Sequence, residues 1–379
     1  MVNRLKNALW LIVGAVVAVW AVTSLVGLVQ AGPMDPPGPP TGGTMKPLDQ
    51  IEPRTAIWQP GPGDFPIVIS QPGSYYLGEN INGEADKDGI LIMADNVTLD
   101  LNGFTLKGAE GGSSYNGITV PLDPTGTVYN LSIFNGTIRD WGNAGIGASD
   151  PNGEANNSRL ADLILDGNGG PGVRVGEGST ITRVTARGNG QDGIEALDDT
   201  IVVDSQAISN AGLGIHLGGY AVVSESISAE NTEIGIYVGN YSIVTRSSSS
   251  GNSGDGVNVK EDGTVTDCVV SGNDQNGIVL WFDTLIRGNT AVDNGTGGVG
   301  AGIYAGVTSG QAKNRIEANN VTHNAARGIK VDSAGNLIIA NSAGGNPMNY
   351  EIAGGNTVGP ELFQANPILS NSPWANFSY

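Results

Sequence analysis

Four residues whose side chains can bind anions or transfer protons recur every 21 positions in the middle of this sequence: Arg174, Glu195, His216 and Tyr237. Each stands between two apolar residues, the alternation expected of a short strand with one buried face. A guanidinium can neutralise an anionic substrate, and a carboxylate, an imidazole and a phenol can accept or donate protons. We therefore predict these four as the catalytic residues of any enzyme site on this chain.

Further polar and aromatic residues follow this column within a few positions of it. They are Asp198, Asp199, Tyr220, Tyr241, Lys260 and Trp281. Aromatic rings stack on the apolar face of a sugar, and charged or polar side chains bond to its hydroxyls. We predict that these residues bind substrate, with a polysaccharide or a cell-surface glycan as the partner.

A structural interpretation of the same column is also open. Outward positions of a strand must be polar whatever the function, and Arg174 beside Glu195 could be a surface ion pair of little energetic value. His216 is one of two histidines in the chain, and an exposed histidine need not be catalytic. The column selects residues to test without assigning an activity.

The elements that position the column come from a 21-residue repeat. Asparagine stands at 168, 189, 210, 231, 252, 273 and 294, and glycine followed by Ile or Val comes four positions after each of the first six. Looser copies extend the glycine–aliphatic pairs to eleven, from Gly89 to Gly328. A period near 20 that recurs this often indicates stacked structural repeats.

Each repeat contains three short apolar or alternating segments, for example Ile194–Ala196, Ile201–Val202 and Ser205–Ala207. The links between them are shorter than the ~10–12 residues of a crossover connection, so each strand must pair with its copy in the next repeat. The sequence therefore predicts an all-β solenoid, a single-stranded parallel β-helix of about eleven coils with three short strands per coil. At ~4.8 Å per coil the stack would be roughly 50 Å long.

The repeated asparagines and glycines have structural explanations. Stacked amides can bond to one another and to turn carbonyls, and a glycine before each first strand suits a bend with unusual backbone angles. Cys268 falls in an inward column that holds Ser in neighbouring coils, which predicts a buried, inert thiol.

The Asn-x-x-x-Gly-Ile/Val repeats from Asn168 to Gly277 resemble those of the right-handed parallel β-helix proteins, the pectin-lyase-like superfamily. This superfamily includes polysaccharide lyases, polygalacturonases, alginate epimerases, phage tailspikes and surface adhesins. The resemblance implies a right-handed helix and a secreted or cell-surface protein that binds polysaccharide or acts as an extracellular interaction scaffold. The alternative is a carbohydrate-active enzyme, a polysaccharide lyase in preference to a glycoside hydrolase, that uses the outward face of the first strand.

The two enzyme reactions need different groups. Hydrolysis needs an acid and a base on either side of the glycosidic bond, and the polygalacturonase motifs are not reproduced here, since Tyr237 stands where a basic motif is expected. β-Elimination needs a base at the sugar C5 and a cation on the uronate. Glu195, Asp198 and Asp199 could hold Ca²⁺, with Arg174 or Lys260 as the base. No motif in the sequence requires a cofactor or marks a metal site.

The chain divides into four regions. Residues 1–31 contain an uncharged run from Ala8 to Val29, which predicts a signal peptide or an N-terminal membrane anchor, and small residues at the end of the run favour cleavage. Residues 32–66 are proline-rich and predict an extended spacer. Residues 67–359 form the predicted β-helix domain, and 360–379, where the repeat is lost, a C-terminal capping tail.

The formal charge of -19 and the single cysteine restrict the function classes further. An acidic surface repels nucleic acid and anionic lipid, so we expect no nucleic-acid partner and no membrane insertion of the β-helix domain. Together with the export signal, these features predict a secreted, periplasmic or cell-surface location.

Overall fold

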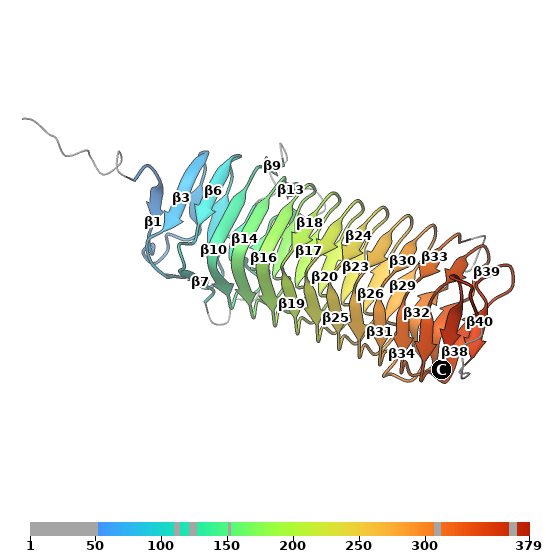
Figure 1. The fold of residues 1–379 in the computed structure, drawn as a ribbon. Helices are drawn as coiled ribbons and strands as arrows, with labels where there is room; N and C mark the ends of the chain where they lie inside the picture. Colours follow the sequence, from blue (N-terminus) through green and yellow to red (C-terminus); the bar gives the residue numbers. More distant parts are fainter. Residues whose placement is uncertain (1–51, 110–113, 121–126, 151–152, 307–311, 364–369) are drawn as a thin grey trace, which may run out of the picture. The chain divides into compact units, whose positions relative to one another are not determined.

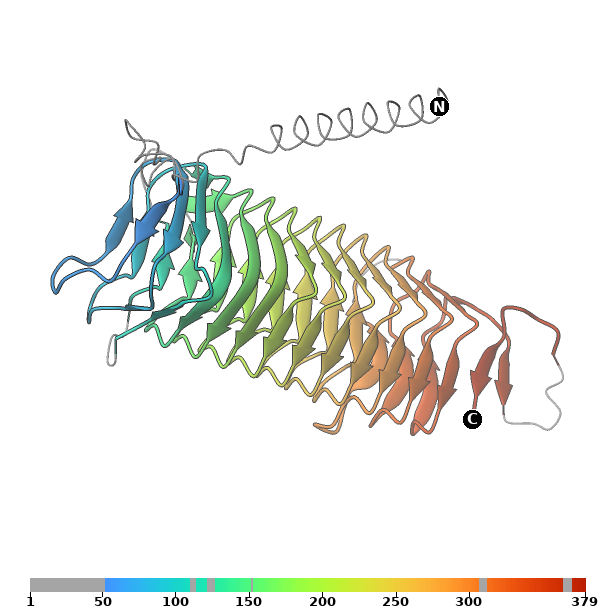
Figure 2. The ribbon, with the colours of Figure 1, turned by 60° about the vertical axis from the view of Figure 1, so that its left-hand side comes forward.

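The protein is described by a computed structural model, which covers residues 52–109, 114–120, 127–150, 153–306, 312–363 and 370–379. Residues 54–379 belong to one unit, and every regular element of its described part is a β-strand. The strands of successive coils lie side by side in sequence order (Figures 1 and 2). The predicted signal peptide or anchor, residues 1–31, lies outside the described residues.

The first strand of each coil belongs to a sheet of 13 strands, called here the first-strand sheet. All its pairings are parallel, and most of its strands have the burial pattern of two buried residues around an outward one. Its strands are β2 (Ile67–Ile69), β5 (Ile90–Ile92), β8 (Ile118–Thr119), β11 (Ile146–Gly147), β15 (Val173–Val175), β17 (Ile194–Ala196), β20 (Ile215–Leu217), β23 (Ile236–Val238), β26 (Val257–Val259), β29 (Ile278–Leu280), β32 (Ala301–Ala305), β35 (Arg327–Val331) and β38 (Met348–Ile352).

The second and third strands of the coils form a sheet of 25 strands, called here the second sheet. Its strands are β1 (Thr55–Ile57), β3 (Gly73–Leu77), β4 (Ile81–Asn82), β6 (Val97–Asp100), β7 (Thr105–Lys107), β10 (Ser132–Arg139), β14 (Arg159–Asp166), β16 (Thr180–Arg187), β18 (Ile201–Val203), β19 (Gln206–Ile208), β21 (Val222–Ser224), β22 (Ile227–Ala229), β24 (Ile243–Thr245), β25 (Ser248–Ser250), β27 (Thr264–Thr266), β28 (Val269–Ser271), β30 (Leu285–Arg287), β31 (Thr290–Val292), β33 (Arg315–Glu317), β34 (Asn320–Thr322), β36 (Leu337–Ile339), β37 (Ser342–Gly344), β39 (Thr357–Val358), β40 (Glu361–Phe363) and β41 (Asn376–Ser378). A small sheet holds β9 (Val128–Tyr129), β12 (Ser149–Asp150) and β13 (Gly153–Asn156).

The predicted fold class is confirmed, with three differences of detail. In β10, β14 and β16 the second and third strands join into continuous strands of eight residues. The first-strand sheet extends past the eleven predicted glycine anchors, because β2 and β38 add a strand at each end. Regular structure also begins earlier than the predicted boundary at residue 67, since β1 lies in the proposed spacer and pairs with β3.

The C-terminal residues that lose the repeat still continue the second sheet. Strand β41 pairs in parallel with both β37 and β40. The N–H of Phe377 donates to the Asn341 carbonyl at 2.8 Å. Part of the open edge of the stack is therefore paired, which reduces the exposure of unsatisfied strand edges.

Interior columns of aliphatic side chains form one continuous core. Ile194, Ile215 and Ile236 occupy the same position of successive first strands and are each 0% exposed. Because each coil packs only on its neighbours, this column extends through the stack as in other solenoids. The middle residue of each first strand is thereby forced outward onto a common face.

The asparagine repeat forms a buried ladder of amides, as predicted. The Nδ2 of Asn210 donates to Asn231 Oδ1 at 3.0 Å and to the Ala186 carbonyl at 3.1 Å. The same side chain accepts the backbone N–H of Asn189 at 3.1 Å. Each amide satisfies buried backbone groups at a turn, so a lost member would leave polar atoms unpaired in the core.

The repeated glycines before the first strands serve a different purpose from the predicted one. Gly193 does not have a positive φ, so its backbone needs no special conformation. A Cβ there would lie 2.6 Å from Asn210 Nδ2 and 2.8 Å from the Gly214 carbonyl oxygen. The glycine is required by close approach of the next coil, and the left-handed positions are occupied by residues such as Asp199 and Asp204.

The predicted buried thiol is confirmed. Cys268 is 1% exposed, and burial raises its pKa to about 11. Its backbone N–H donates to Asn289 Oδ1 at 3.0 Å, in a column where Ser226 bonds to Ser247 Oγ. A protonated, enclosed thiol has neither the charge nor the access of a reactive cysteine.

Candidate active site on the first-strand sheet

The four predicted catalytic residues lie on adjacent strands of one face. Register pairs Arg174 with Glu195, Glu195 with His216, and His216 with Tyr237. All four side chains are partly exposed. The 21-residue spacing therefore places them one strand apart, about 4.8 Å.

His216 forms the central contact of the group, with a residue that the sequence analysis did not select. Its Nδ1 lies 2.9 Å from Asp192 Oδ2. The other oxygen, Asp192 Oδ1, accepts the backbone N–H of Leu213 at 2.8 Å. Asp192 side-chain exposure is 14% against 38% for His216, so a mostly enclosed carboxylate orients a more accessible imidazole.

The Asp192 contact also sets the charge state of the imidazole. The hydrogen bond to Asp192 raises the pKa of His216 above its ordinary value, and this effect exceeds the opposing effect of burial. The protonated form of His216 is thus stabilised by a fixed acceptor. Such a pair, open to solvent on one side, is suited to proton transfer.

Asp192 was missed because it does not occupy an outward strand position. It lies in the turn before β17, two residues ahead of Ile194, and its side chain reaches the next coil. Its position is filled by Leu213 and Ile234 in the two following coils. The same turn column holds a second carboxylate, Asp255, so the sequence gives no signal that singles out Asp192.

Glu195 and Arg174 form the adjacent ion pair. Arg174 Nε lies 2.7 Å from Glu195 Oε2, with side-chain exposures of 35% and 25%. A half-exposed pair of this kind contributes little to stability. It does place a guanidinium and a carboxylate directly beside the imidazole.

Tyr237, Lys260 and Trp281 continue the group on the other side of His216. The Tyr237 ring meets the His216 ring edge-on, with centroids 5.2 Å apart and planes at 84°. The Lys260 ammonium lies 5.5 Å from the Tyr237 ring centre and 5.1 Å from that of Trp281. Two aromatic faces thus hold one cation next to the imidazole.

Tyr220 and Tyr241 form a separate aromatic platform in the following turn. Their rings stack with centroids 4.9 Å apart and planes at 12°, and they are 57% and 51% exposed. Both residues have left-handed backbones, with φ of 54° and 60°, a conformation that is rare for large side chains. Two exposed rings held in strained positions are a feature to explain by function.

The two predicted turn acids lie apart from this group. Asp198 and Asp199 are exposed, and Asp198 Oδ1 accepts the Gly219 N–H at 2.7 Å. Asp199 has a left-handed φ of 58°. Both remain near the platform turn, where they can meet sugar hydroxyls.

A metal site on these residues would have a different composition from the predicted calcium site. Across the described ranges, one group of His, Cys, Asp and Glu has ligand atoms all within 4.8 Å of one another, namely Asp192, Glu195 and His216. Ca²⁺ takes six to eight oxygen ligands, whereas this group offers an imidazole and a carboxylate already paired with Arg174. These residues fit a shared proton better than Ca²⁺.

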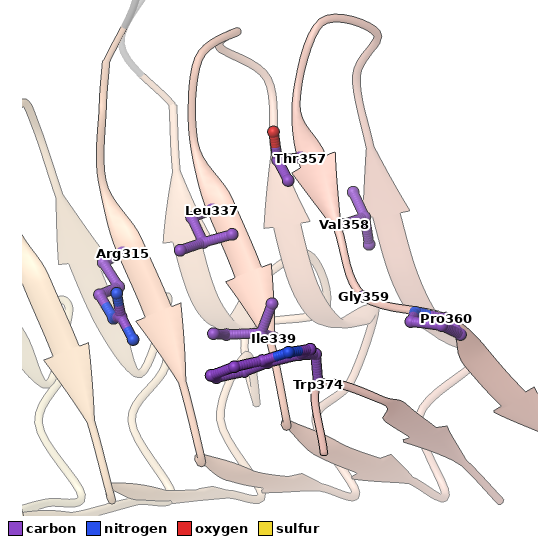
Figure 3. Close-up of a pocket in the computed structure, with 8 residues that line it drawn as sticks. All are labelled: Arg315, Leu337, Ile339, Thr357, Val358, Gly359, Pro360 and Trp374. Atoms are coloured by element: carbon purple, nitrogen blue, oxygen red, sulfur yellow. The ribbon is translucent and has the colours of Figure 1, made fainter. Parts of the chain in front are cut away.

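A cavity at the C-terminal end of the second sheet lies away from this group. It has a volume of about 360 Å³ and is lined by Arg315, Thr357, Ile339, Trp374 and neighbouring apolar residues. Figure 3 shows the Trp374 ring beside the Ile339 side chain. Arg315 is the only charged residue in its lining, so this cavity offers no acid–base pair.

The comparisons with known proteins define the fold. Residues 171–311 match the model of the right-handed β-helix region family. No curated protein sequence matches the chain significantly. In the part of the chain that the structure describes, no helix is long and apolar enough to cross a membrane.

Solved structures of the same fold cover most of the chain. The A-module of the mannuronan C-5 epimerase AlgE4 from Azotobacter vinelandii is 15% identical with a TM-score of 0.54, over 76% of this chain and 91% of that one. The A-module of AlgE6 from the same organism is 16% identical with a TM-score of 0.50, over 81% and 91%. This chain therefore has the right-handed parallel β-helix fold that the predicted resemblance implies.

Proposed function

We propose that this chain is a carbohydrate-active enzyme that transfers protons at a sugar carbon of an acidic polysaccharide bound along the first-strand sheet. The observation that carries the proposal is His216, held by Asp192 at 2.9 Å and in edge contact with Tyr237. An imidazole oriented by a carboxylate beside a phenol supplies an acid and a base to one ligand. The sequence alone favoured a binding or scaffolding function, and the contact with Asp192 is the reason to place the enzyme first.

His216 would be the base. Its Nδ1 faces Asp192, which leaves Nε2 for the substrate. Neutral Nε2 would take the proton from C5 of a uronate residue, and the electron pair of the broken C–H bond would move into the adjacent carboxylate. Asp192 would stabilise the resulting imidazolium.

Two outcomes follow from that intermediate. Return of a proton from Tyr237 to the opposite face of C5 inverts the centre, which is epimerisation. In elimination, the electron pair held by the carboxylate forms a C4–C5 double bond, the C4–O bond breaks with its electrons on oxygen, and Tyr237 protonates that oxygen as the chain is cleaved. The same base serves both reactions, so the position of the second acid decides between them.

Lys260 would neutralise the uronate carboxylate. Its ammonium contacts the rings of Tyr237 and Trp281, and none of the salt bridges in the described ranges involves it. Arg174 is already bonded to Glu195, so it would contribute less than Lys260 to neutralising the uronate carboxylate. A cation on the carboxylate stabilises the negative charge that develops when the C5 proton leaves.

The substrate class is supported by the fold relatives. The two structures with TM-scores of 0.54 and 0.50 are both mannuronan C-5 epimerases, and mannuronan is a uronate polymer. Hydrolysis ranks below proton transfer because Asp192 and Glu195 are each bonded to a basic side chain, while hydrolysis needs two carboxyl groups facing the substrate.

No cofactor is needed for the proposed steps, and Ca²⁺ would enter as a bridge between the acidic protein and a polyanion.

The proposed substrate sets the expected location. Such polymers lie outside the cytoplasm, and the uncharged run from Ala8 to Val29 predicts export. We therefore propose a periplasmic, secreted or cell-surface protein.

The test compares products on mannuronan, polygalacturonate and a neutral glucan. Epimerisation is read from anomeric proton NMR signals, elimination from the absorbance of unsaturated uronate, and hydrolysis from new reducing ends without that absorbance. Turnover of a uronate polymer that falls by ~10²–10⁴ in His216→Gln but persists in His323→Gln, the other histidine, supports the proposal. Binding without turnover of any polymer would instead establish the scaffold function.

A further inference from the structure

A second group of side chains on the same face repeats the composition of the candidate active site. Strands β32, β35 and β38 continue the first-strand sheet, and register places Tyr304, Lys330 and Glu351 in the outward column. Val279 precedes Tyr304 in that column and is 9% exposed. The buried valine separates two polar groups on one continuous strip.

The contacts within the two groups correspond. The Lys330 ammonium lies 5.0 Å from the Tyr304 ring centre, as Lys260 lies 5.5 Å from that of Tyr237. Arg327 forms an ion pair with Glu351 on the next strand, as Arg174 does with Glu195. Both groups therefore present a tyrosine ring under a lysine, with an arginine–glutamate pair beside it.

The second group has one contact that fixes its hydroxyl and its ammonium together. Tyr304 Oη donates to Asp332 Oδ2 at 3.1 Å, and Lys330 Nζ lies 2.8 Å from the same oxygen. Asp332 has a side-chain exposure of 40% and Lys330 of 27%. Donors and acceptors for sugar hydroxyls are thus held in place at the surface.

The second group lacks the feature that makes the first one catalytic. Its column contains no histidine: the second histidine of the chain, His323, lies in the turn after β34. The Tyr304 hydroxyl is bonded to a carboxylate and burial raises its pKa. This group can bind a sugar, but its two carboxylates are each paired with a basic side chain, Asp332 with Lys330 and Glu351 with Arg327.

Five strand steps separate His216 from Lys330 along the column, or ~24 Å at ~4.8 Å per step. A repeating polymer presents the same chemical group at regular intervals along its length. Two similar groups on one strip at this separation therefore match two residues of one extended chain.

We propose that Tyr304, Lys330 and Asp332 form a second, non-catalytic subsite for the same acidic polysaccharide, occupied when the polymer extends ~24 Å or more from His216. The chemical identity of the polymer rests on the proposed function. Occupation of this subsite adds affinity for long chains by raising the effective concentration of the polymer at His216.

The experiment measures binding and turnover against chain length. Oligomannuronates shorter and longer than ~24 Å are titrated into the wild type, into Lys330→Ala and into the charge-matched control Arg183→Ala, which lies on the second sheet. We expect Lys330→Ala to weaken binding of the long oligomers about tenfold, to leave the short oligomers unchanged and to keep kcat. Arg183→Ala should behave as the wild type, and thermal unfolding of each variant checks folding.

The outcomes separate this inference from the proposed function. Equal effects of Lys330→Ala on short and long oligomers, or no effect on either, would overturn the second subsite. The conservative variant Tyr304→Phe should keep the ring and weaken long-chain binding less than Tyr304→Ala. If no polymer is turned over but length-dependent binding is lost in Lys330→Ala, the subsite stands and the enzyme proposal fails.

Discussion

Asp192 Oδ2 and His216 Nδ1 lie 2.9 Å apart, although the two residues are 24 positions apart in the chain. The 21-residue coil explains this, because a turn residue reaches the outward residue of the next first strand. The carboxylate is anchored by the N–H of Leu213, so its position does not depend on the histidine. This contact converts an outward column of polar residues into a candidate acid–base site.

Asp192→Asn should shift the pH dependence of turnover. The hydrogen bond to Asp192 raises the pKa of His216, and a base must be neutral to act. The wild type therefore loses kcat/KM as pH falls through this raised pKa. In the variant the pKa of His216 should drop, so the acid limb of the kcat/KM profile should move to lower pH while the maximum rate also falls.

An NMR titration provides the control for that prediction. The ring signals of His216 should titrate at a lower pH in Asp192→Asn than in the wild type. An acid limb that stays in place while the His216 signals shift would show that another group is the base.

The same pair should make stability depend on pH. A histidine whose pKa is raised by folding adds stability that is fully present below its unfolded value, near 6.5, and that is lost as pH rises through the folded value. Because His216 side-chain exposure is 38%, solvent screens part of the effect. The free energy of unfolding lost in Asp192→Asn should thus be larger at pH 5 than at pH 9, as urea titrations can measure, and a loss that grows with pH would contradict the assigned protonation.

The fold was predictable from the sequence because the same residue types recur at the same position of each coil in a solenoid. The aliphatic columns, the amide ladder through Asn210 and the buried Cys268 each follow from one position recurring every coil. The site was only partly predictable, since register fixes which residues share a face but not where turn side chains reach. Asp192 was not predicted because its carboxylate contacts a residue of the next coil. The reason for glycine at position 193 was predicted wrongly, because local backbone preferences do not reveal how closely the next coil approaches.

Gly193→Ala should destabilise the stack through crowding alone. A Cβ would lie 2.6 Å from Asn210 Nδ2 and 2.8 Å from the Gly214 carbonyl oxygen, and forced overpacking costs ~1–3 kcal/mol. The matched control is Gly354→Ala, where a Cβ meets nothing within 4 Å and φ is not positive. Urea unfolding should show the loss for Gly193 alone, and an equal loss at both sites would show that crowding is not the cause.

Asn231→Ala should remove one rung of the buried ladder. Its Nδ2 donates to Asn252 Oδ1 at 2.9 Å and to the Ala207 carbonyl at 3.1 Å, and its Oδ1 accepts the N–H of Asn210 at 3.0 Å. Asn252 Oδ1 still accepts the backbone N–H of residue 231, whereas the N–H of Asn210 loses its acceptor. An unpaired buried group costs ~1–3 kcal/mol, so we expect a loss of that size in the free energy of unfolding. Asn240→Ala, at a partly exposed turn position, should change stability by less than ~0.5 kcal/mol. If both variants unfold alike, the ladder does not stabilise the stack.

The double change of Tyr220→Asn and Tyr241→Asn should separate stability from binding. Asparagine tolerates the left-handed backbone that these tyrosines adopt at φ of 54° and 60°, so relief of strain offsets the lost ring stacking, worth ~0.5–1.5 kcal/mol. The free energy of unfolding should then change by less than about 1 kcal/mol, while polysaccharide affinity falls about tenfold because the exposed rings no longer stack on sugar. Calorimetric titration with mannuronan and urea unfolding measure the two quantities on the same samples. Unchanged affinity would mean that the platform is not part of the binding face, and a large loss of stability would mean that the rings are held for structural reasons.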